Sequence, residues 1–87
     1  MDQTTVLAEL TSYVSKELLA GQSAGLEPST PLIEWGVINS IEIARLIAFI
    51  NRRFGVSVPG ELIVLDNFKN LESISKLVMA RLSSTDR

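Results

Sequence analysis

The chain has 87 residues, enough for one small domain near the lower size limit for folding without disulfides or metals. Hydrophobic residues make up 46% of it, which is enough for one compact core, and the formal net charge is −2, from eight basic and ten acidic residues. This charge argues against a nucleic-acid partner, because nucleic-acid binding needs a basic surface.

Histidine and cysteine are both absent from the sequence. The absence of cysteine excludes a disulfide framework and a cysteine-based metal site. Without histidine the chain lacks the usual general base and the commonest transition-metal ligand. Ser-His-Asp, Cys-His and zinc hydrolase schemes therefore cannot be assembled from this chain alone. We expect no enzymatic activity, no catalytic residue and no metal site.

Neither a signal peptide nor a membrane span is predicted. Residues 1–5 show no basic region followed by an apolar one. The longest apolar runs, residues 46–50 and 62–65, are far too short to cross a bilayer. We expect a soluble, cytoplasmic monomer with no membrane partner, made of one domain over residues 1–87 and free-standing rather than excised from a larger enzyme.

The first predicted helix covers residues 5–20. Apolar side chains recur along it at helical spacing, namely Val6, Leu7, Leu10, Val14 and Leu18. Thr4 or Thr5 can cap its start, and Gly21 is expected to end it.

A long connection follows, residues 21–39, with three Gly, two Pro and several Ser and Thr. Loops of this length are usually functional or disordered. Disorder is not expected here, since Leu26, Leu32, Ile33 and Trp35 can pin the loop to the core. Trp35 is therefore predicted to be a packing residue; the alternative is that it lines a groove for a group attached nearby.

The second predicted helix runs from Ser40 to about Phe54. Its core face holds Ile43, Leu46, Ile47, Ile50 and Phe54. The residues that point elsewhere are Ile41, Ala44, Arg45, Ala48 and Arg52. An apolar Ile41 with two alanines on an exposed face suggests a surface that docks on partners, although single exposed apolar residues are ordinary.

Three features are predicted between the second and the last helix. Gly55 ends the second helix in the C′ position, and residues 56–59 are extended because the residue before a proline avoids the helical region. A β-strand is conceivable there, but no partner strand is evident. A short third helix or helical turn is expected within residues 60–66, and a turn over residues 67–70.

The last predicted helix runs from Leu71 to about Leu82, with Asn70 as its cap. Apolar residues again recur at helical spacing along it. Residues 83–87 are expected to fray. Together the elements predict an all-α fold, a small four-helix bundle of three main helices and one short one, with a long loop after the first helix.

Ser40 stands at the start of the second predicted helix, directly after Asn39. Asn is among the best N-cap residues, and Glu42 follows at the spacing of a capping box. If Asn39 is the cap, the hydroxyl of Ser40 is left free at the positive end of the helix dipole, where a phosphate is favoured. On local sequence alone, the alternative is that Ser40 is an ordinary cap.

Short motifs occur in order along the chain. They are Thr30-Pro31-Leu32, Glu34 to Gly36, Asn39-Ser40-Ile41, Arg45-Leu46, Phe54-Gly55-Val56, Val58-Pro59, Asn67-Phe68 and Leu71 to Ile74. This order resembles that of the acyl carrier and peptidyl carrier protein family, from about residue 5 to residue 80. In that family the Ser of a G-x-D-S-L or G-x-H-S-L type motif carries 4′-phosphopantetheine. The matching position in this chain is Ser40.

The resemblance implies that Ser40 is a substrate rather than a catalyst, which agrees with the poor nucleophilicity of a Ser without a base. A separate phosphopantetheinyl transferase would move the group from coenzyme A to Ser40, between Asn39 and Ile41, and would supply the base and the metal ion. The thiol of the arm would then hold an acyl or aminoacyl cargo as a thioester. The implied partners are that transferase, an acyl- or aminoacyl-loading enzyme and downstream synthase enzymes.

The second helix is the main recognition surface of that family. The resemblance therefore implies a partner-binding face made of Trp35, Ile41, Glu42, Ala44, Arg45, Ala48 and Arg52. Fatty-acid carriers typically have a strongly acidic face there, whereas this helix has three arginines and one glutamate. The mixed charge favours polyketide or nonribosomal peptide assembly, and it implies that the partner enzymes are not uniformly basic.

The attachment motif also departs from the family pattern. Asn39 replaces the usual Asp or His before the modified Ser, which removes a charge that could help the transferase or its metal. Ile41 replaces the common Leu, a small change. Asn39 is the one feature that favours the alternative function, an unmodified carrier-like scaffold or interaction module.

Overall fold

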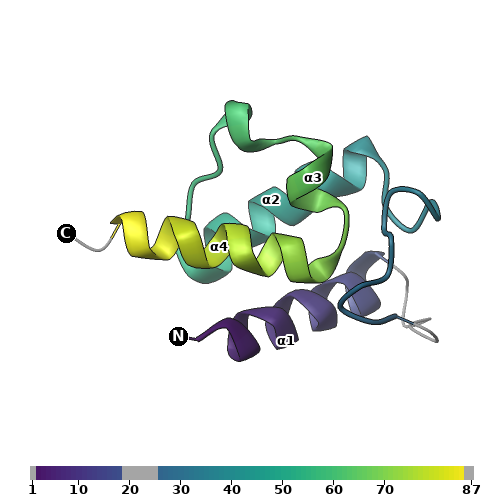
Figure 1. Cartoon of the computed structure of the whole chain (residues 1–87), viewed down its shortest axis with the longest axis horizontal. Coiled ribbons are helices and arrows are strands. Elements are labelled where there is room, and N and C mark those ends of the chain that lie inside the picture. The colour runs from purple at the N-terminus through teal and green to yellow at the C-terminus, as the bar shows by residue number, and fades with distance from the viewer. Residues whose placement is uncertain (1, 19–25, 86–87) are drawn as a thin grey trace.

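The computed structural model describes residues 2–18 and 26–85 of the chain. Its elements in chain order are α1 (Gln3–Tyr13), the π-helix η1 (Val14–Leu18), α2 (Ser40–Phe54), the 3₁₀-helix η2 (Gly60–Leu62), α3 (Leu65–Phe68) and α4 (Leu71–Thr85) (Figure 1). No strand occurs within these described ranges. The prediction of an all-α fold with three main helices, a short one and a long connection after the first is confirmed.

The helices pack around one core, with α1 lying against α4 and the short α3 packing on α4. In Figure 1, α2 lies behind α4, and the segment that carries η2 arches away from the bundle. Both ends of the chain lie on the left of that view, whereas the start of α2 and α3 lie on the right. The start of α2 is therefore at the end of the bundle opposite to the termini.

α1 begins earlier than predicted because Asp2 caps it, rather than Thr4 or Thr5. The Asp2 carboxylate accepts a hydrogen bond from the Thr5 backbone N–H at 2.9 Å. This bond lowers the pKa of Asp2, and the negative charge suits the start of a helix. The helical path continues through η1 to Leu18, and the predicted end at Gly21 lies outside the described residues.

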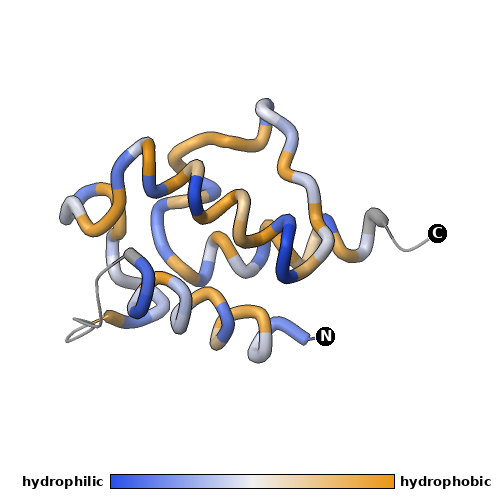
Figure 2. Tube along the Cα trace, turned by 180° about the vertical axis from the view of Figure 1, so that it is seen from behind, coloured by the Kyte–Doolittle hydropathy of each residue, from blue (hydrophilic) through white to orange (hydrophobic). Residues whose placement is uncertain are grey.

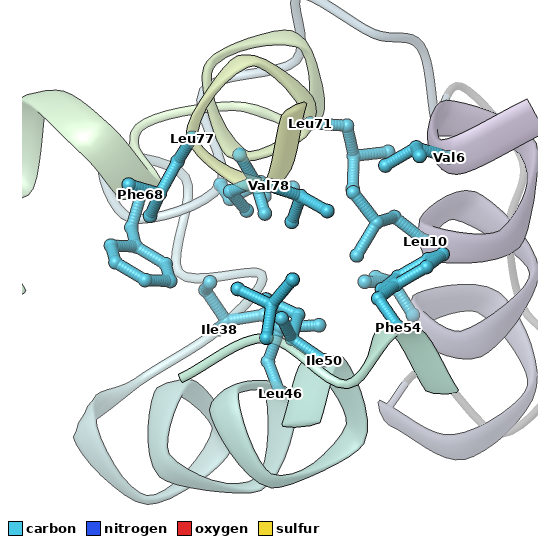
Figure 3. Packing of buried hydrophobic residues seen from close by; sticks show 14 residues of the cluster. Val6, Leu10, Ile38, Leu46, Ile50, Phe54, Phe68, Leu71, Leu77 and Val78 are labelled. Carbon is cyan, nitrogen blue, oxygen red and sulfur yellow. The ribbon is translucent and has the colours of Figure 1, made fainter. Parts of the chain in front are cut away.

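The core combines one apolar face of each main helix with side chains from the connecting segments. Its buried residues are Val6, Leu10, Val14, Leu32, Ile38, Leu46, Ile50, Phe54, Val56, Phe68, Leu71, Ile74, Leu77 and Val78. Figure 3 shows Leu46 and Ile50 of α2 pointing across this core toward Val78 of α4. Ile43 and Ile47, predicted for the same face of α2, are only partly buried and flank the core.

The connection before α2 is held by backbone hydrogen bonds and not by Trp35. The Leu32 N–H donates to the Lys69 carbonyl at 2.8 Å, and the N–H groups of Val37 and Ile38 donate to the Leu32 carbonyl at 2.7 and 3.2 Å. Leu32 and Ile38 are thereby buried. The prediction that Trp35 packs is wrong: the turn that brings Leu32 and Ile38 inward leaves the Trp35 side chain 68% exposed.

The helical turn predicted within residues 60–66 forms as η2, but the short α-helix α3 extends beyond that span. Residues 60–66 contain η2 and only the first two residues of α3, while Asn67 and Phe68, predicted as part of a turn, complete that helix. Phe68 is 1% exposed, so tertiary burial rather than local propensity decides where the helical turn lies. Asn70 caps the next helix as predicted, since its side-chain oxygen accepts from the Ser73 N–H at 2.7 Å.

α4 stays helical to Thr85, whereas fraying was predicted after Leu82. Leu82 packs against the core from its edge, and Arg81 Nε donates to the Ser57 carbonyl at 3.2 Å. These contacts hold the last turns of the helix in place. Residues 86 and 87 lie outside the described residues.

Two Ile→Ala substitutions in α2 test this assignment of core and surface. Ile50→Ala should lower the free energy of unfolding by about 2–5 kcal/mol, because it leaves a cavity in the core. Ile41→Ala removes the same atoms from a side chain that is 72% exposed and should change that free energy by less than about 0.5 kcal/mol. Urea denaturation of both variants measures the difference, and equal losses would contradict the assignment.

Candidate functional site

α2 begins at a reciprocal pair of hydrogen bonds between Asn39 and Glu42. Asn39 Oδ1 accepts from the Glu42 backbone N–H at 3.0 Å, and Glu42 Oε1 accepts from the Asn39 backbone N–H at 2.9 Å. The Asn39 backbone is extended, with φ −121° and ψ −172°, as an N-cap residue requires. The predicted capping box is therefore confirmed, and it satisfies backbone N–H groups that the start of the helix would otherwise leave unbonded.

Ser40 is the first residue of α2 and is exposed. The alternative that Ser40 is the cap is wrong, because Asn39 fills that position. Among the described residues, none forms a hydrogen bond with the Ser40 hydroxyl. The hydroxyl is thus uncommitted at the positive end of the helix dipole, where an attached phosphate is favoured.

An abrupt change from core to surface sets the position of this hydroxyl. Ile38 is 2% exposed, whereas Ile41, three residues later, is 72% exposed. Gly36 turns the chain ahead of them with φ +69°, a backbone conformation that other residues rarely adopt. Ser40 is therefore held between a buried anchor and a capped helix.

An exposed apolar segment precedes and begins α3. Ile63, Val64 and Leu65 are 43%, 48% and 70% exposed. Beside them lies a cavity of about 330 Å³, lined by Ile33, Ile43, Ile63, Val64, Leu65 and Phe68. Sequence reasoning missed this apolar surface. Its signal was the apolar run over residues 62–65, but the periodicity of so short a run does not show which side chains are buried.

The predicted partner-binding residues lie mostly on the surface. Trp35, Ile41, Ala44, Arg45, Ala48 and Arg52 are exposed, and Glu42 is half-buried in the capping box. Their exposure agrees with a docking role, which stays a prediction. Trp35 stands on the preceding turn, and the other six residues stand on α2.

The chemistry offered by the described residues is limited. Across residues 2–18 and 26–85, no group of three or more His, Cys, Asp or Glu side chains is placed to hold a metal ion. None of the helices in those ranges is both long and apolar enough to span a membrane. At this end of the bundle, the uncommitted hydroxyl of Ser40 lies at the capped start of α2.

A family model described as "Phosphopantetheine attachment site" matches residues 6–78, which is most of the chain. The chain belongs to this family. It is 30% identical over 71 residues, 82% of each chain, to a protein of Serratia sp. (strain ATCC 39006) named "Probable acyl carrier protein PigG". A chain of a solved structure named "Crystal structure of FAD-dependent dehydrogenase" matches with a TM-score of 0.75 and 29% identity, over 79% of this chain and 97% of that chain.

Membership of the phosphopantetheine-attachment family makes this protein a carrier and not a catalyst. The cofactor of the family is covalently attached 4′-phosphopantetheine, and its carriers interact with phosphopantetheinyl transferases and synthase enzymes. The described residues fit that cofactor, since Ser40 offers an exposed, unbonded hydroxyl at a helix start. The family resemblance seen in the sequence and the cofactor that it implied are confirmed.

Substitution of the cap tests the geometry of this helix start. Asn39→Ala should lower the free energy of unfolding by about 1 kcal/mol, because an N-cap acceptor is lost. Asn39→Asp should stay close to the wild-type value, since Asp caps as well as Asn does. Thermal and urea denaturation measure both variants. A neutral Asn39→Ala variant would show that the Asn39–Glu42 pair does not hold the helix start.

Proposed function

We propose that this chain carries its 4′-phosphopantetheine arm on Ser40, with Asn39 and Ile41 on either side of the attachment point. The supporting observation is the exposed Ser40 hydroxyl, which makes no hydrogen bond with the described residues. It is free because Asn39 and Glu42 form the capping box and accept the hydrogen bonds of the helix start. The residues matched by the family model include this position. The dipole and the free N–H groups of the first turn favour the negative charge of the phosphodiester.

The loading reaction in this proposal is carried out by a phosphopantetheinyl transferase with coenzyme A as donor. The Ser40 oxygen forms a bond to the phosphorus that bears the pantetheine group. The bond from that phosphorus to the bridging oxygen of the coenzyme A pyrophosphate breaks, and adenosine 3′,5′-bisphosphate leaves. The Ser40 proton passes to a base of the transferase, since this chain has no His and a Ser without a positioned base is a poor nucleophile.

The loaded chain holds an acyl or aminoacyl cargo as a thioester on the thiol of the arm and delivers it between enzymes. We assign it to polyketide or nonribosomal peptide assembly rather than to fatty-acid synthesis. One observation supports this assignment: α2 carries three arginines and one glutamate, whereas fatty-acid carriers typically have a strongly acidic face there. In this proposal the chain acts as one domain, as a monomer and in the cytoplasm.

The structural match supports a further step, oxidation of the cargo by an FAD-dependent dehydrogenase. Since 79% of this chain covers 97% of the matched chain, the two chains are of similar size and share the fold. A carrier-like chain thus occurs in a structure that is named for a flavin enzyme. In the step that we propose, two hydrogens leave the carrier-bound cargo and reduce FAD to FADH₂.

Loading at Ser40 is tested by mass spectrometry of the intact protein. After incubation with a phosphopantetheinyl transferase and coenzyme A, the wild-type chain should gain the mass of one phosphopantetheinyl group and Ser40→Ala should gain none. Ser57→Ala, a matched change at another exposed serine, should load like the wild type. An unmodified wild-type chain across several transferases would contradict the proposal. A Ser40→Ala variant that keeps full pathway activity would support the unmodified scaffold instead.

The oxidation step is tested with the dehydrogenase of the matched structure. The wild-type chain, loaded with a set of acyl and aminoacyl cargoes, should bleach the flavin absorbance of that enzyme with at least one cargo, because FAD is reduced. The same cargo on free pantetheine should react much more slowly, since it lacks the contacts of the carrier with the enzyme. A flavin that stays oxidised with every cargo would contradict this step but not the attachment at Ser40.

A further inference from the structure

Arg45, Ala48 and Arg52 form a basic stripe on the exposed face of α2. Their spacing of three and four residues places them in one row along the helix, and all three are exposed. Figure 2, which views the molecule from the side of α2, shows hydrophilic and hydrophobic residues alternating along the helix. With a rise of about 1.5 Å per residue, the two arginines stand about 10 Å apart along the axis.

The other charges of α2 are already engaged. Arg53 makes two hydrogen bonds to Glu9, Nε to Oε1 at 3.1 Å and Nη2 to Oε2 at 3.0 Å, and these bonds lower the pKa of Glu9. Glu42 is held in the capping box. By contrast, the guanidinium groups of Arg45 and Arg52 have no ion pair or hydrogen bond with any described residue.

A hollow of about 520 Å³ opens along this stripe. Its lining consists of Tyr13, Glu17, Arg45, Ala48, Phe49 and Arg52. The rings of Tyr13 and Phe49 are stacked, with centroids 4.2 Å apart and planes inclined by 15°, and the Tyr13 hydroxyl donates to the Arg45 carbonyl at 3.3 Å. The hollow therefore has a fixed aromatic wall beside two uncommitted cations, with Glu17 as the acidic residue in its lining.

We propose that this hollow and the basic stripe receive an acidic helix of an enzyme that acts on the cargo carried at Ser40. A guanidinium group matches a carboxylate through paired hydrogen bonds, and Arg and Tyr are frequent energetic centres of protein interfaces. Two carboxylates two helical turns apart on the partner would face Arg45 and Arg52 together. The inference rests on the proposed function, because it names the charge of the partner surface that docks beside the arm.

A polyanionic membrane or nucleic acid fits the same surface less well. Recognition of anionic lipids typically uses clusters of about 4–8 basic residues, whereas this stripe has two free arginines next to Glu17. The net charge of the whole chain is −2, which repels an extended polyanion. By contrast, two carboxylates on a protein surface can bind to Arg45 and Arg52 alone, whatever the net charge of the rest of the chain.

The test is a titration of the ¹⁵N-labelled, unloaded protein with a synthetic helical peptide that carries two Glu residues seven positions apart. Backbone amide shifts should move around Arg45, Ala48 and Phe49, in a saturable way that weakens as salt is added. The same peptide with Gln at both positions should bind about tenfold more weakly or not at all. Absence of shifts with the Glu peptide, or equal shifts with the Gln peptide, would overturn the inference.

Charge-reversal variants locate the interaction. Arg45→Glu and Arg52→Glu should each weaken binding of the Glu peptide about tenfold. Lys76→Glu makes the same change of net charge at an exposed position of α4 and should leave binding unchanged. An equal loss in all three variants, or tighter binding to phosphatidylglycerol vesicles than to the peptide, would contradict the acidic-helix assignment.

Ser40→Ala should bind the peptide like the wild type, so failure of docking and failure of loading are separate results.

Discussion

The reciprocal hydrogen bonds between Asn39 and Glu42 are the interaction on which this site depends. A helix start needs an acceptor for its first N–H groups, and a serine at that place is often the residue that supplies it. Here the Asn39 side chain accepts from the Glu42 N–H, and the Glu42 side chain accepts from the Asn39 N–H. The Ser40 hydroxyl is therefore not needed as a cap and makes no hydrogen bond with the described residues. A serine that had to act as cap would lose a stabilising bond worth about 1 kcal/mol before it could be esterified.

The packing around α2 gives one helix two roles. Its inner face, with Leu46, Ile50 and Phe54, fills the core, and the buried Ile38 fixes the chain just before the helix begins. Its outer face carries Ile41, two alanines, and Arg45 and Arg52, which are unpaired among the described residues and lie outside the core. A rigid helix therefore joins the attachment point to the surface on which partners are proposed to dock, so that docking can place the arm in a defined direction.

Short-range signals made α2 predictable from the sequence, and long-range packing explains the errors. The bounds of α2 and its capping box depend on residues a few positions apart, and apolar periodicity identified the buried faces of the main helices. The prediction that Trp35 packs in the core was wrong because Leu32 and Ile38 are the buried residues of this segment, and the turn between them leaves Trp35 exposed. The sequence predicted the helical turn that forms as η2, but it did not predict that α3 extends to Phe68, because the burial of Phe68 depends on packing against distant parts of the chain.

The most direct test of the central claim is to map the modification on the wild-type protein after loading. Tandem mass spectrometry of proteolytic fragments can assign the phosphopantetheinyl group to one residue. The account predicts that the group lies on Ser40 alone, within a protein whose helix content and unfolding transition are those of the unloaded chain. A group found on another serine, or attached at Ser40 only when the fold is lost, would contradict it.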